Sequence, residues 1–276
     1  MSWLEVRVHC GGSRERDAIV AALVAAGAAG AQELDDGLLT HLPDDAPLDG
    51  VEAAVLAAGG DASVSYLPVG DIDWAARWPT RVGVQRVGRI AVAPPWLASD
   101  IADAAIPIVI EPATAFGTGE HETTRGILRL MQDVVRAGDV VADLGAGSAV
   151  LSIAAAKLGA ARVAAVEIDE DAIGNAEENV TRNDARDAVT VIGGDAAILL
   201  PLLAPVRVIL ANIISSVILE LAPSMRDALA ADGRAIVSGI LVAEREMVVG
   251  ALAATGWRLE SELADGDWWS AVIAKR

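Results

Sequence analysis

Short apolar runs alternate with helical patterns along the chain after residue 105. Helical periodicity fills the segments between these runs, as at 171–183 and 215–229. Parallel strands that are covered on both faces are continuously apolar and rich in β-branched residues. The runs that we assign to strands are IPIVI, VVADL, RVAAVEI, AVTVI, RVILAN, GRAIVSG, WRLESEL and WWSAVIA. The pattern predicts a Rossmann-like, doubly wound α/β sheet that ends in a hairpin, because only ADGD separates the last two strands.

The beginning of the chain follows a different pattern of short elements. Helical patterns at 14–26 and 49–58 are combined with the strand-like stretches WLEVRV, AQEL, LLTHL and SVSYL. The resulting order, β-α-β-β-α-β, is typical of small ferredoxin-like α+β domains. We therefore expect a separate small domain before the α/β sheet.

These patterns divide the chain into three parts. We expect an α+β domain at 1–70, a linker at 71–105 and an α/β domain at 106–276. The DIDWAARW stretch of the linker predicts a short helix with Trp74 and Trp78 on one face. Aromatic pairs at helical spacing usually pack in a core, so we expect these tryptophans to lie between the domains.

The composition is that of a soluble protein. Hydrophobic residues make up 53% of the chain, but alanine supplies much of this share. The longest apolar run, residues 18–31, is too short to span a bilayer. The first residues, MSWLEVRVHC, show no secretory signal, and the single Cys10 excludes an internal disulfide. We expect a cytoplasmic protein without membrane association.

The charge is strongly negative. The formal net charge is −18, from 39 acidic and 21 basic residues. Such a field favours solubility and attracts basic partners. Nucleic-acid binding needs a cationic surface that replaces counterions, so we expect no stable nucleic-acid binding.

A glycine-rich loop follows the strand VVADL. The loop GAGSAV leads into a helix, whose N-terminal N–H groups form a binding site for polar ligands. Glu167 ends the next strand, 22 residues after Gly145. A carboxylate at this spacing accepts hydrogen bonds from ribose hydroxyls. The loop and the carboxylate together predict an adenosine site.

Two templates for an adenosine cofactor differ at this loop. The dinucleotide motif G-x-G-x-x-G requires glycine at position 150, which is Val150. The methyltransferase motif D/E-x-G-x-G-x-G is matched by Asp143, Gly145 and Gly147, with Ala149 in place of its third glycine. A plain strand-to-helix turn is the structural alternative. Asp143 and the carboxylate downstream favour the methyltransferase loop.

Two further segments carry candidate ligand-binding residues. The segment EPATAFGTGEHETTRGIL places the chain's only phenylalanine, Phe116, beside Gly117 and Thr118, just before a helix that begins with threonines. Glycines allow close approach of the backbone to a ligand, and threonines offer hydroxyls. Asn212 ends the strand RVILAN at the carboxyl edge of the sheet, where ligands bind in open α/β folds. Capping of the following helix is the alternative role for Asn212.

Other site types are not indicated. The three histidines and Cys10 lack metal-ligand spacing, so we expect no metal site. No serine stands in a nucleophile-elbow pattern, and no Gly-Lys-Ser/Thr sequence follows a glycine run.

The motifs together resemble one family. IPIVIEPATAFGTGEHETTR, VVADLGAGSAVLSIAAAKLGA, VEIDEDAIGNAEENVTRND, VILANI and GRAIVSGIL are similar to the ribosomal protein L-eleven (L11) methyltransferases, the PrmA family. The similarity covers roughly residues 71–276. It implies a class I methyltransferase fold, S-adenosylmethionine as methyl donor, and lysine or N-terminal amines of L11 as acceptors. It also implies that residues 1–70 recognise the substrate.

The resemblance assigns roles to individual residues. It places cofactor contacts at Thr124, Gly145, Glu167 and Asn212, with the loop residues Asp143 and Gly147 beside them. Phe116, Gly117 and Thr118 would form a lid over the methionine end of the cofactor and shape the entrance for the amine. Apart from the resemblance, we expect Asn212 to orient this amine through its carbonyl oxygen. The sequence departs from the family pattern at Ala149, where glycine is usual, and at Glu167, where aspartate is commoner.

Two other functions stay open. One is a class I methyltransferase that acts on another protein, on RNA or on a small molecule. Ile213 and Ile214 follow Asn212, so no aromatic residue stands there to stack a flipped base, which disfavours a nucleic-acid substrate. The other is a non-catalytic cofactor-binding protein, which only Ala149 favours.

Overall fold

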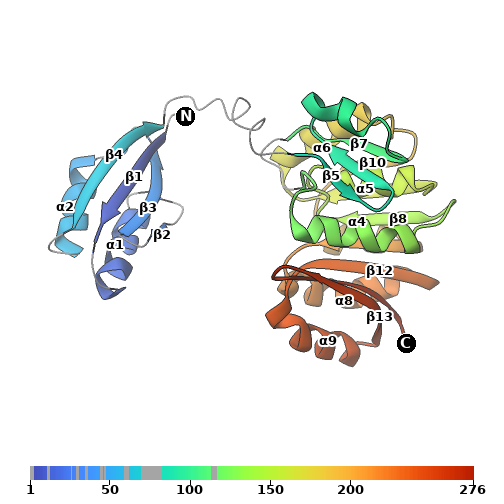
Figure 1. The fold of residues 1–276 in the computed structure, drawn as a ribbon. Coiled ribbons are helices and arrows are strands. Elements are labelled where there is room, and N and C mark those ends of the chain that lie inside the picture. The colour runs from blue at the N-terminus through green and yellow to red at the C-terminus, as the bar shows by residue number, and fades with distance from the viewer. Residues whose placement is uncertain are drawn as a thin grey trace. The chain divides into compact units, whose positions relative to one another are not determined.

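The structure is a computed structural model in which the chain forms two compact units, Met1–Ala76 and Arg77–Arg276. Both units are drawn in Figure 1. The residues that the structure describes are 3–10, 13–25, 27–28, 31–34, 37–43, 46, 48–58, 62–69, 83–112 and 117–276. Trp74 and Trp78, for which the sequence predicts a short helix, lie outside these ranges, as does Phe116.

The first unit is a four-stranded antiparallel sheet with two helices. Its elements are β1 (Trp3–His9), α1 (Ser13–Ala25), β2 (Gln32–Leu34), β3 (Gly37–Pro43), α2 (Leu48–Ala58) and β4 (Ser63–Val69). The strand order is β2-β3-β1-β4. Val6 and Val8 of β1 pack with Ile19 and Leu23 of α1 and with Val55 of α2. This is the β-α-β-β-α-β arrangement that the sequence predicts.

The second unit contains a seven-stranded sheet with helices on both faces (Figure 1). The strand order is β10-β9-β8-β11-β12-β14-β13, and all neighbours are parallel except for the pairs that β14 forms. The strands of this sheet are β8 (Val140–Leu144), β9 (Arg162–Glu167), β10 (Val189–Gly193), β11 (Val206–Asn212), β12 (Leu229–Leu241), β13 (Trp257–Asp265) and β14 (Trp268–Lys275). The helices are α4 (Glu122–Val134), α5 (Val150–Lys157), α6 (Glu170–Arg182), α7 (Ala196–Leu203), α8 (Ser215–Ala228), η3 (Val242–Glu244) and α9 (Arg245–Ala254). The doubly wound sheet with a terminal hairpin is therefore confirmed.

The apolar runs of the central strands are buried on both faces. Successive side chains of a strand point to opposite faces, so neighbouring residues enter different cores. One core is formed with α4, α5 and α6, and the other with α7, α8 and α9. The neighbouring pairs are Val141 and Ala142 in β8, Val208 and Ile209 in β11, and Ile236 and Val237 in β12.

A second, three-stranded sheet precedes α4. Its strands are β5 (Gln85–Val87), β6 (Ile90–Ala93) and β7 (Ile106–Val109), with the 3-10 helix η2 (Pro95–Ile101) between β6 and β7. The IPIVI run is thus a strand, as expected, but it pairs with β6 and not with the large sheet. Residues 85–101, which lie in the expected linker, belong to the second unit because Ile90 and Val92 join its core.

The topology of the large sheet determines where a ligand can bind. From β8 the chain continues outward to β9 and β10 on one side, and β11 flanks β8 on the other. The carboxyl ends of β8 and β11 therefore border a crevice at the switch point, the usual ligand site of such sheets. In the part of the chain that the structure describes, no helix is long and apolar enough to cross a membrane.

Candidate functional site

A cavity of about 420 Å³ lies at this switch point. Pockets of this size hold small-molecule ligands and cofactors. Six of the nine residues that the sequence selects as site residues line it, namely Gly117, Thr124, Gly145, Gly147, Glu167 and Asn212. The other lining residues are Ala146, Val150, Leu151, Ile168, Asp169, Ala172 and Ile213. The structure thus brings the glycine loop, the ends of β9 and β11, and the start of α4 around one space.

The loop between β8 and α5 depends on left-handed backbone conformations. Gly145 and Gly147 have φ angles of 73° and 52°, and Ala149 has a φ angle of 64°. A Cβ atom at Gly145 would lie 2.7 Å from a methyl carbon of Ile213, so this position also needs glycine for space. For alanine the left-handed conformation costs about 1–2 kcal/mol. Ala149, which stands where the family usually has glycine, therefore carries backbone strain that glycine would not have.

Glu167, the last residue of β9, is hydrogen-bonded to this loop. Its Oε2 accepts a hydrogen bond from the N–H of Gly147 at 2.7 Å, and its Oε1 accepts from the N–H groups of Ile168 at 2.8 Å and Asp169 at 2.9 Å. The side chain is 8% exposed and lines the cavity. A carboxylate has about four acceptor positions, so one remains for a ligand hydroxyl while the three backbone donors fix its orientation.

Asp143 lies beneath the loop and is not among the residues that line the cavity. It is fully buried, and its Oδ2 accepts a hydrogen bond from the Ser152 hydroxyl at 2.7 Å. Its Oδ1 has no hydrogen-bond partner among the described residues. Burial raises the pKa of Asp143 to about 7; the Ser152 hydrogen bond opposes this rise and the Glu167 charge adds to it. The structure thus places Asp143 as a support for the loop.

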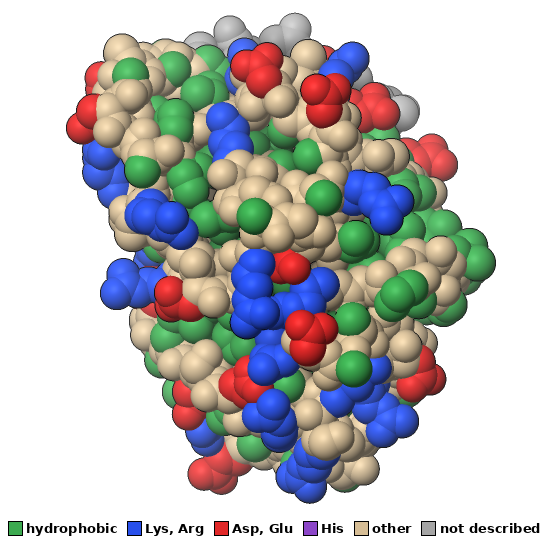
Figure 2. Space-filling model, turned by 90° about the vertical axis from the view of Figure 1, so that its right-hand side faces the viewer, with side chains coloured by type: hydrophobic (Ala, Val, Ile, Leu, Met, Phe, Trp, Pro, Cys, Tyr) green, Lys and Arg blue, Asp and Glu red, His purple; other side chains and the backbone are tan. Residues whose placement is uncertain are grey.

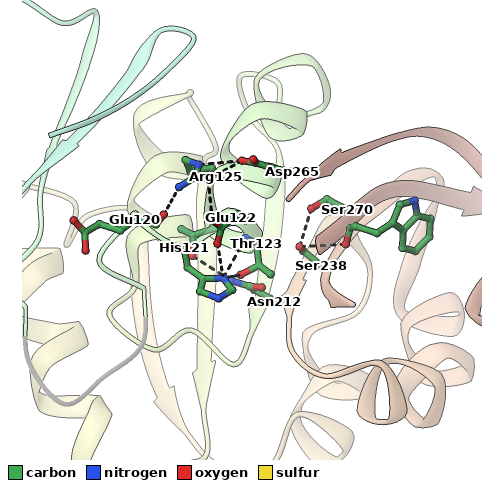
Figure 3. Close-up of polar contacts among 11 residues, drawn as sticks. Glu120, His121, Glu122, Thr123, Arg125, Asn212, Ser238, Asp265 and Ser270 are labelled. Carbon is green, nitrogen blue, oxygen red and sulfur yellow. Dashed lines mark hydrogen bonds and ion pairs between the residues drawn. The ribbon is translucent and has the colours of Figure 1, made fainter. Parts of the chain in front are cut away.

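Asn212 points toward the start of α4. Its Nδ2 donates to the hydroxyl of Thr124 at 3.4 Å; Figure 3 shows Asn212 beside the residues that begin α4. The helix α8 begins at Ser215, its N-cap residue is Ile214, and no side chain caps it within the described part. The capping alternative for Asn212 is therefore wrong, because β11 extends through Asn212 and the helix starts later.

A polar network holds the segment that leads into α4 (Figure 3). His121 is the N-cap residue, and its Nδ1 accepts from the Thr123 N–H at 3.3 Å. Arg125 donates two hydrogen bonds to Asp265, at 3.0 and 2.9 Å, and a third to the Glu120 carbonyl. Thr118, at the beginning of this segment, does not line the cavity. The network fixes the backbone after Gly117.

A second cavity of about 300 Å³ adjoins the first. The two share Gly145, Ile168 and Ile213. Asp195 and the apolar residues Val217 and Leu221 are among the residues that line the second cavity. Sequence reasoning missed Asp195, although the Gly-Gly-Asp sequence after the strand AVTVI is a usable signal for a residue at the carboxyl edge of the sheet.

Comparison with solved structures assigns the fold. The second unit matches a class I methyltransferase fold: a ribosomal protein L11 methylase from Lactobacillus delbrueckii subsp. bulgaricus superimposes with a TM-score of 0.63 and 29% identity, covering 70% of this chain and 98% of that one. The chain belongs to the ribosomal protein L11 methyltransferase (PrmA) family, whose model matches residues 46–276. The resemblance seen in the sequence is confirmed.

Curated relatives carry the same family name. A ribosomal protein L11 methyltransferase of Desulforamulus reducens is 37% identical over 203 residues, which are 73% of this chain and 65% of that protein. One from Thermus thermophilus is 40% identical over 200 residues, or 72% of this chain and 76% of the relative. The chain thus spans just under two thirds of the length of the Desulforamulus protein.

The residues present suit the cofactor of this family. Class I methyltransferases use S-adenosylmethionine as methyl donor, so the cofactor expected from the sequence is confirmed at the level of the family. In this structure Glu167 presents a carboxylate to the cavity, and α5 directs its N-terminus toward it.

Proposed function

We propose that this protein is an S-adenosylmethionine-dependent methyltransferase that methylates lysine or N-terminal amines of ribosomal protein L11. Membership of the PrmA family supports the activity and the substrate. The observation that carries the proposal is the convergence of Thr124, Gly145, Glu167 and Asn212 on one cavity, because the family resemblance assigns cofactor contacts to these four positions.

The residues divide the recognition of the cofactor among them. The free acceptor position of Glu167 would hold a ribose hydroxyl, and the backbone of Gly145 and Gly147 would allow close approach of the ligand. The second cavity, which Asp195 and Val217 both line, suits a flat base that has both a polar edge and apolar faces. Gly117 and Thr124 close the remaining side.

Methyl transfer to an amine requires the neutral form of that amine. The cofactor supplies an activated methyl group on a sulfonium, so the protein contributes geometry. A free lysine has a pKa of about 10.4, and apolar surroundings lower that pKa. Asn212 uses its Nδ2 to bind Thr124, which leaves its Oδ1 to accept a hydrogen bond from the incoming amine and orient it. Phe116 and Thr118 stay predicted residues of the entrance.

The N-terminal unit is the proposed docking domain for the substrate. Residues 1–76 contain 13 acidic and three basic residues. A surface with this charge attracts a basic ribosomal protein and steers its approach. A shortened chain of residues 77–276 is therefore expected to bind the cofactor and to fail to methylate folded L11. Full activity of the shortened chain would contradict the docking role.

Nucleic acid is not the expected partner. On the face shown in Figure 2, Lys and Arg side chains gather in the middle and lower part, and Asp and Glu side chains lie between and beside them. Among the described residues, basic side chains also pair directly with acidic ones, as Arg245 does with Glu262 at 2.7 Å. An ion pair satisfies the charge locally, so such a surface attracts phosphates less than an unpaired basic patch does.

One experiment separates the candidate functions. The purified protein is incubated with methyl-labelled S-adenosylmethionine and with separated ribosomal proteins or ribosomal RNA. We expect label in L11 alone, and mass spectrometry then assigns it to lysine side chains or the N-terminal amine. Label in RNA or in another protein would replace L11 as the substrate, and cofactor binding without any transfer would identify a non-catalytic protein.

A further inference from the structure

Three asparagines follow one face of α6 at intervals of four residues. Asn175 and Asn179 bind the backbone of Glu111, just after β7, and Asn183 binds the backbone of Val109, the last residue of β7. Residues four apart lie above one another on a helix, so the three amides form a row. Asn179 is fully buried and Asn183 is 7% exposed. Buried amides need partners, and the partners here differ along the row.

The side-chain amide of Asn183 pairs with the backbone of Val109, as the backbone of a neighbouring strand would. Its Oδ1 accepts from the Val109 N–H at 2.8 Å, and its Nδ2 donates to the Val109 carbonyl at 2.6 Å. Both backbone groups of one residue are thereby satisfied at the end of β7. This asparagine has a structural role that involves no residue of the cavity.

Asn179 has an additional partner in the cofactor loop. Its Oδ1 accepts from the Glu111 N–H at 2.8 Å, and its Nδ2 donates to the Ser148 carbonyl at 3.2 Å. The Ser148 carbonyl belongs to the peptide that precedes Ala149, the alanine in the left-handed conformation. The amide of Asn179 therefore holds the peptide plane on which this strained turn depends.

Ser148 extends the connection to the other side of the cavity. Its hydroxyl donates to the Gly117 carbonyl at 2.7 Å, and a Cβ atom at Gly117 would lie 2.7 Å from that hydroxyl oxygen. Gly117 lines the cavity, and so do Gly147 and Val150 on either side of the Ser148–Ala149 peptide. One chain of hydrogen bonds thus joins α6, the glycine loop and Gly117.

We propose that Asn179 is a positioning residue for the cofactor: it holds the left-handed turn at Ala149 and, through Ser148, sets the distance between the glycine loop and Gly117. The inference rests on the proposed function only for the identity of the ligand. Asn179 acts on affinity through the loop and touches neither the cofactor nor the acceptor.

The test compares two matched substitutions in the full chain. Asn179→Asp keeps the acceptor for Glu111 and replaces by an oxygen the donor to the Ser148 carbonyl and to the side-chain oxygen of Asn175. Asn183→Asp makes the same change one turn away, where only Val109 and the Asn179 carbonyl lose a donor. Calorimetry with S-adenosylmethionine is expected to show a Kd at least tenfold higher for Asn179→Asp and within twofold of wild type for Asn183→Asp. With saturating cofactor, kcat of Asn179→Asp is expected to stay within about threefold of wild type.

A further variant keeps the test decisive if a buried aspartate prevents folding. Ser148→Ala adds no charge and removes the hydroxyl that donates to Gly117 and accepts from the Val150 N–H, and we expect it to raise the Kd threefold to tenfold. Hydrogen exchange in Asn179→Asp is expected to increase at residues 147–151 and not at 106–109. Unchanged affinity in folded Asn179→Asp, or in Ser148→Ala if Asn179→Asp does not fold, would overturn the inference. A wild-type chain that binds no S-adenosylmethionine would instead overturn the proposed function.

Discussion

Asp143→Asn is expected to make the folded protein less sensitive to pH. In the wild type this carboxyl is buried beneath the glycine loop, and burial raises its pKa from 3.8 to about 7. Asparagine keeps the shape and the oxygen that accepts from Ser152, but it has no charge to bury. The variant therefore isolates the cost of ionising this one group.

The magnitude follows from linkage between protonation and folding. Between pH 3.8 and 7 the unfolded chain has lost the Asp143 proton while the folded protein still holds it, so stability falls as pH rises through this window. A shift of about three pKa units corresponds to about 4 kcal/mol over the whole window. From pH 5.5 to 7 the loss is about 2 kcal/mol, and above pH 7 the Asp143 contribution is constant.

The assay is urea unfolding of both proteins at intervals from pH 5.5 to 8.5. This range stays above the isoelectric point of about 4.4, and the buried Trp257 and Trp269 report the second unit by fluorescence. The free energy of unfolding of the variant minus that of wild type should increase by about 2 kcal/mol between pH 5.5 and 8.5. If the difference in the free energy of unfolding is the same at every pH, the reasoning is refuted. Asp143 in the folded wild type would then not change its protonation between pH 5.5 and 8.5.

Substitutions at three other positions test the site. Glu167→Ala should weaken S-adenosylmethionine binding by about 1–3 kcal/mol, since it also leaves the Gly147 N–H unpaired, and calorimetry that shows unchanged affinity would remove Glu167 from the site. Asn212→Ala should lower kcat more than cofactor affinity; because Asn212 caps no helix, thermal unfolding should change little, and normal turnover would end its catalytic role. Ala149→Gly should alter stability by less than about 1 kcal/mol, because relief of strain offsets the lost methyl group and the added chain entropy. Ala149→Val should cost at least about 2 kcal/mol in urea unfolding, and equal stability of the two variants would show that the turn is not strained.

Much of the fold follows from local sequence patterns. Continuous apolar runs identify buried parallel strands because both faces of such strands are covered, and the cores on the two faces of β8, β11 and β12 show this. The convergence of Gly145, Glu167 and Asn212 is also predictable, since each lies at the carboxyl end of a parallel strand.

Other features depend on contacts between distant segments. The IPIVI run itself predicts a strand. Its partner, β6, lies in the expected linker, so the pairing could not be predicted from the run. The sequence does not single out Asp195 as a cavity residue, because an aspartate just before a helix is already explained as its N-cap. Asp195 does cap α7, since it accepts from the Ala197 N–H at 2.8 Å. The function of Asn179 cannot be read from α6 alone, because its partners lie 31 and 68 residues away in the sequence.

The ion pair between Arg125 and Asp265 connects the C-terminal hairpin to the start of α4, which borders the cavity. The two residues are 140 positions apart, yet Asp265 receives two hydrogen bonds from the arginine that also holds the Glu120 carbonyl. Gly126 leaves no room for a Cβ atom against Ser270, so α4 and β14 are in direct contact as well. A tag, a fusion partner or a substitution at this turn therefore acts on the segment that enters the cavity. For engineering, the Asp265–Asp267 turn should be treated as part of the candidate site and not as a free surface loop.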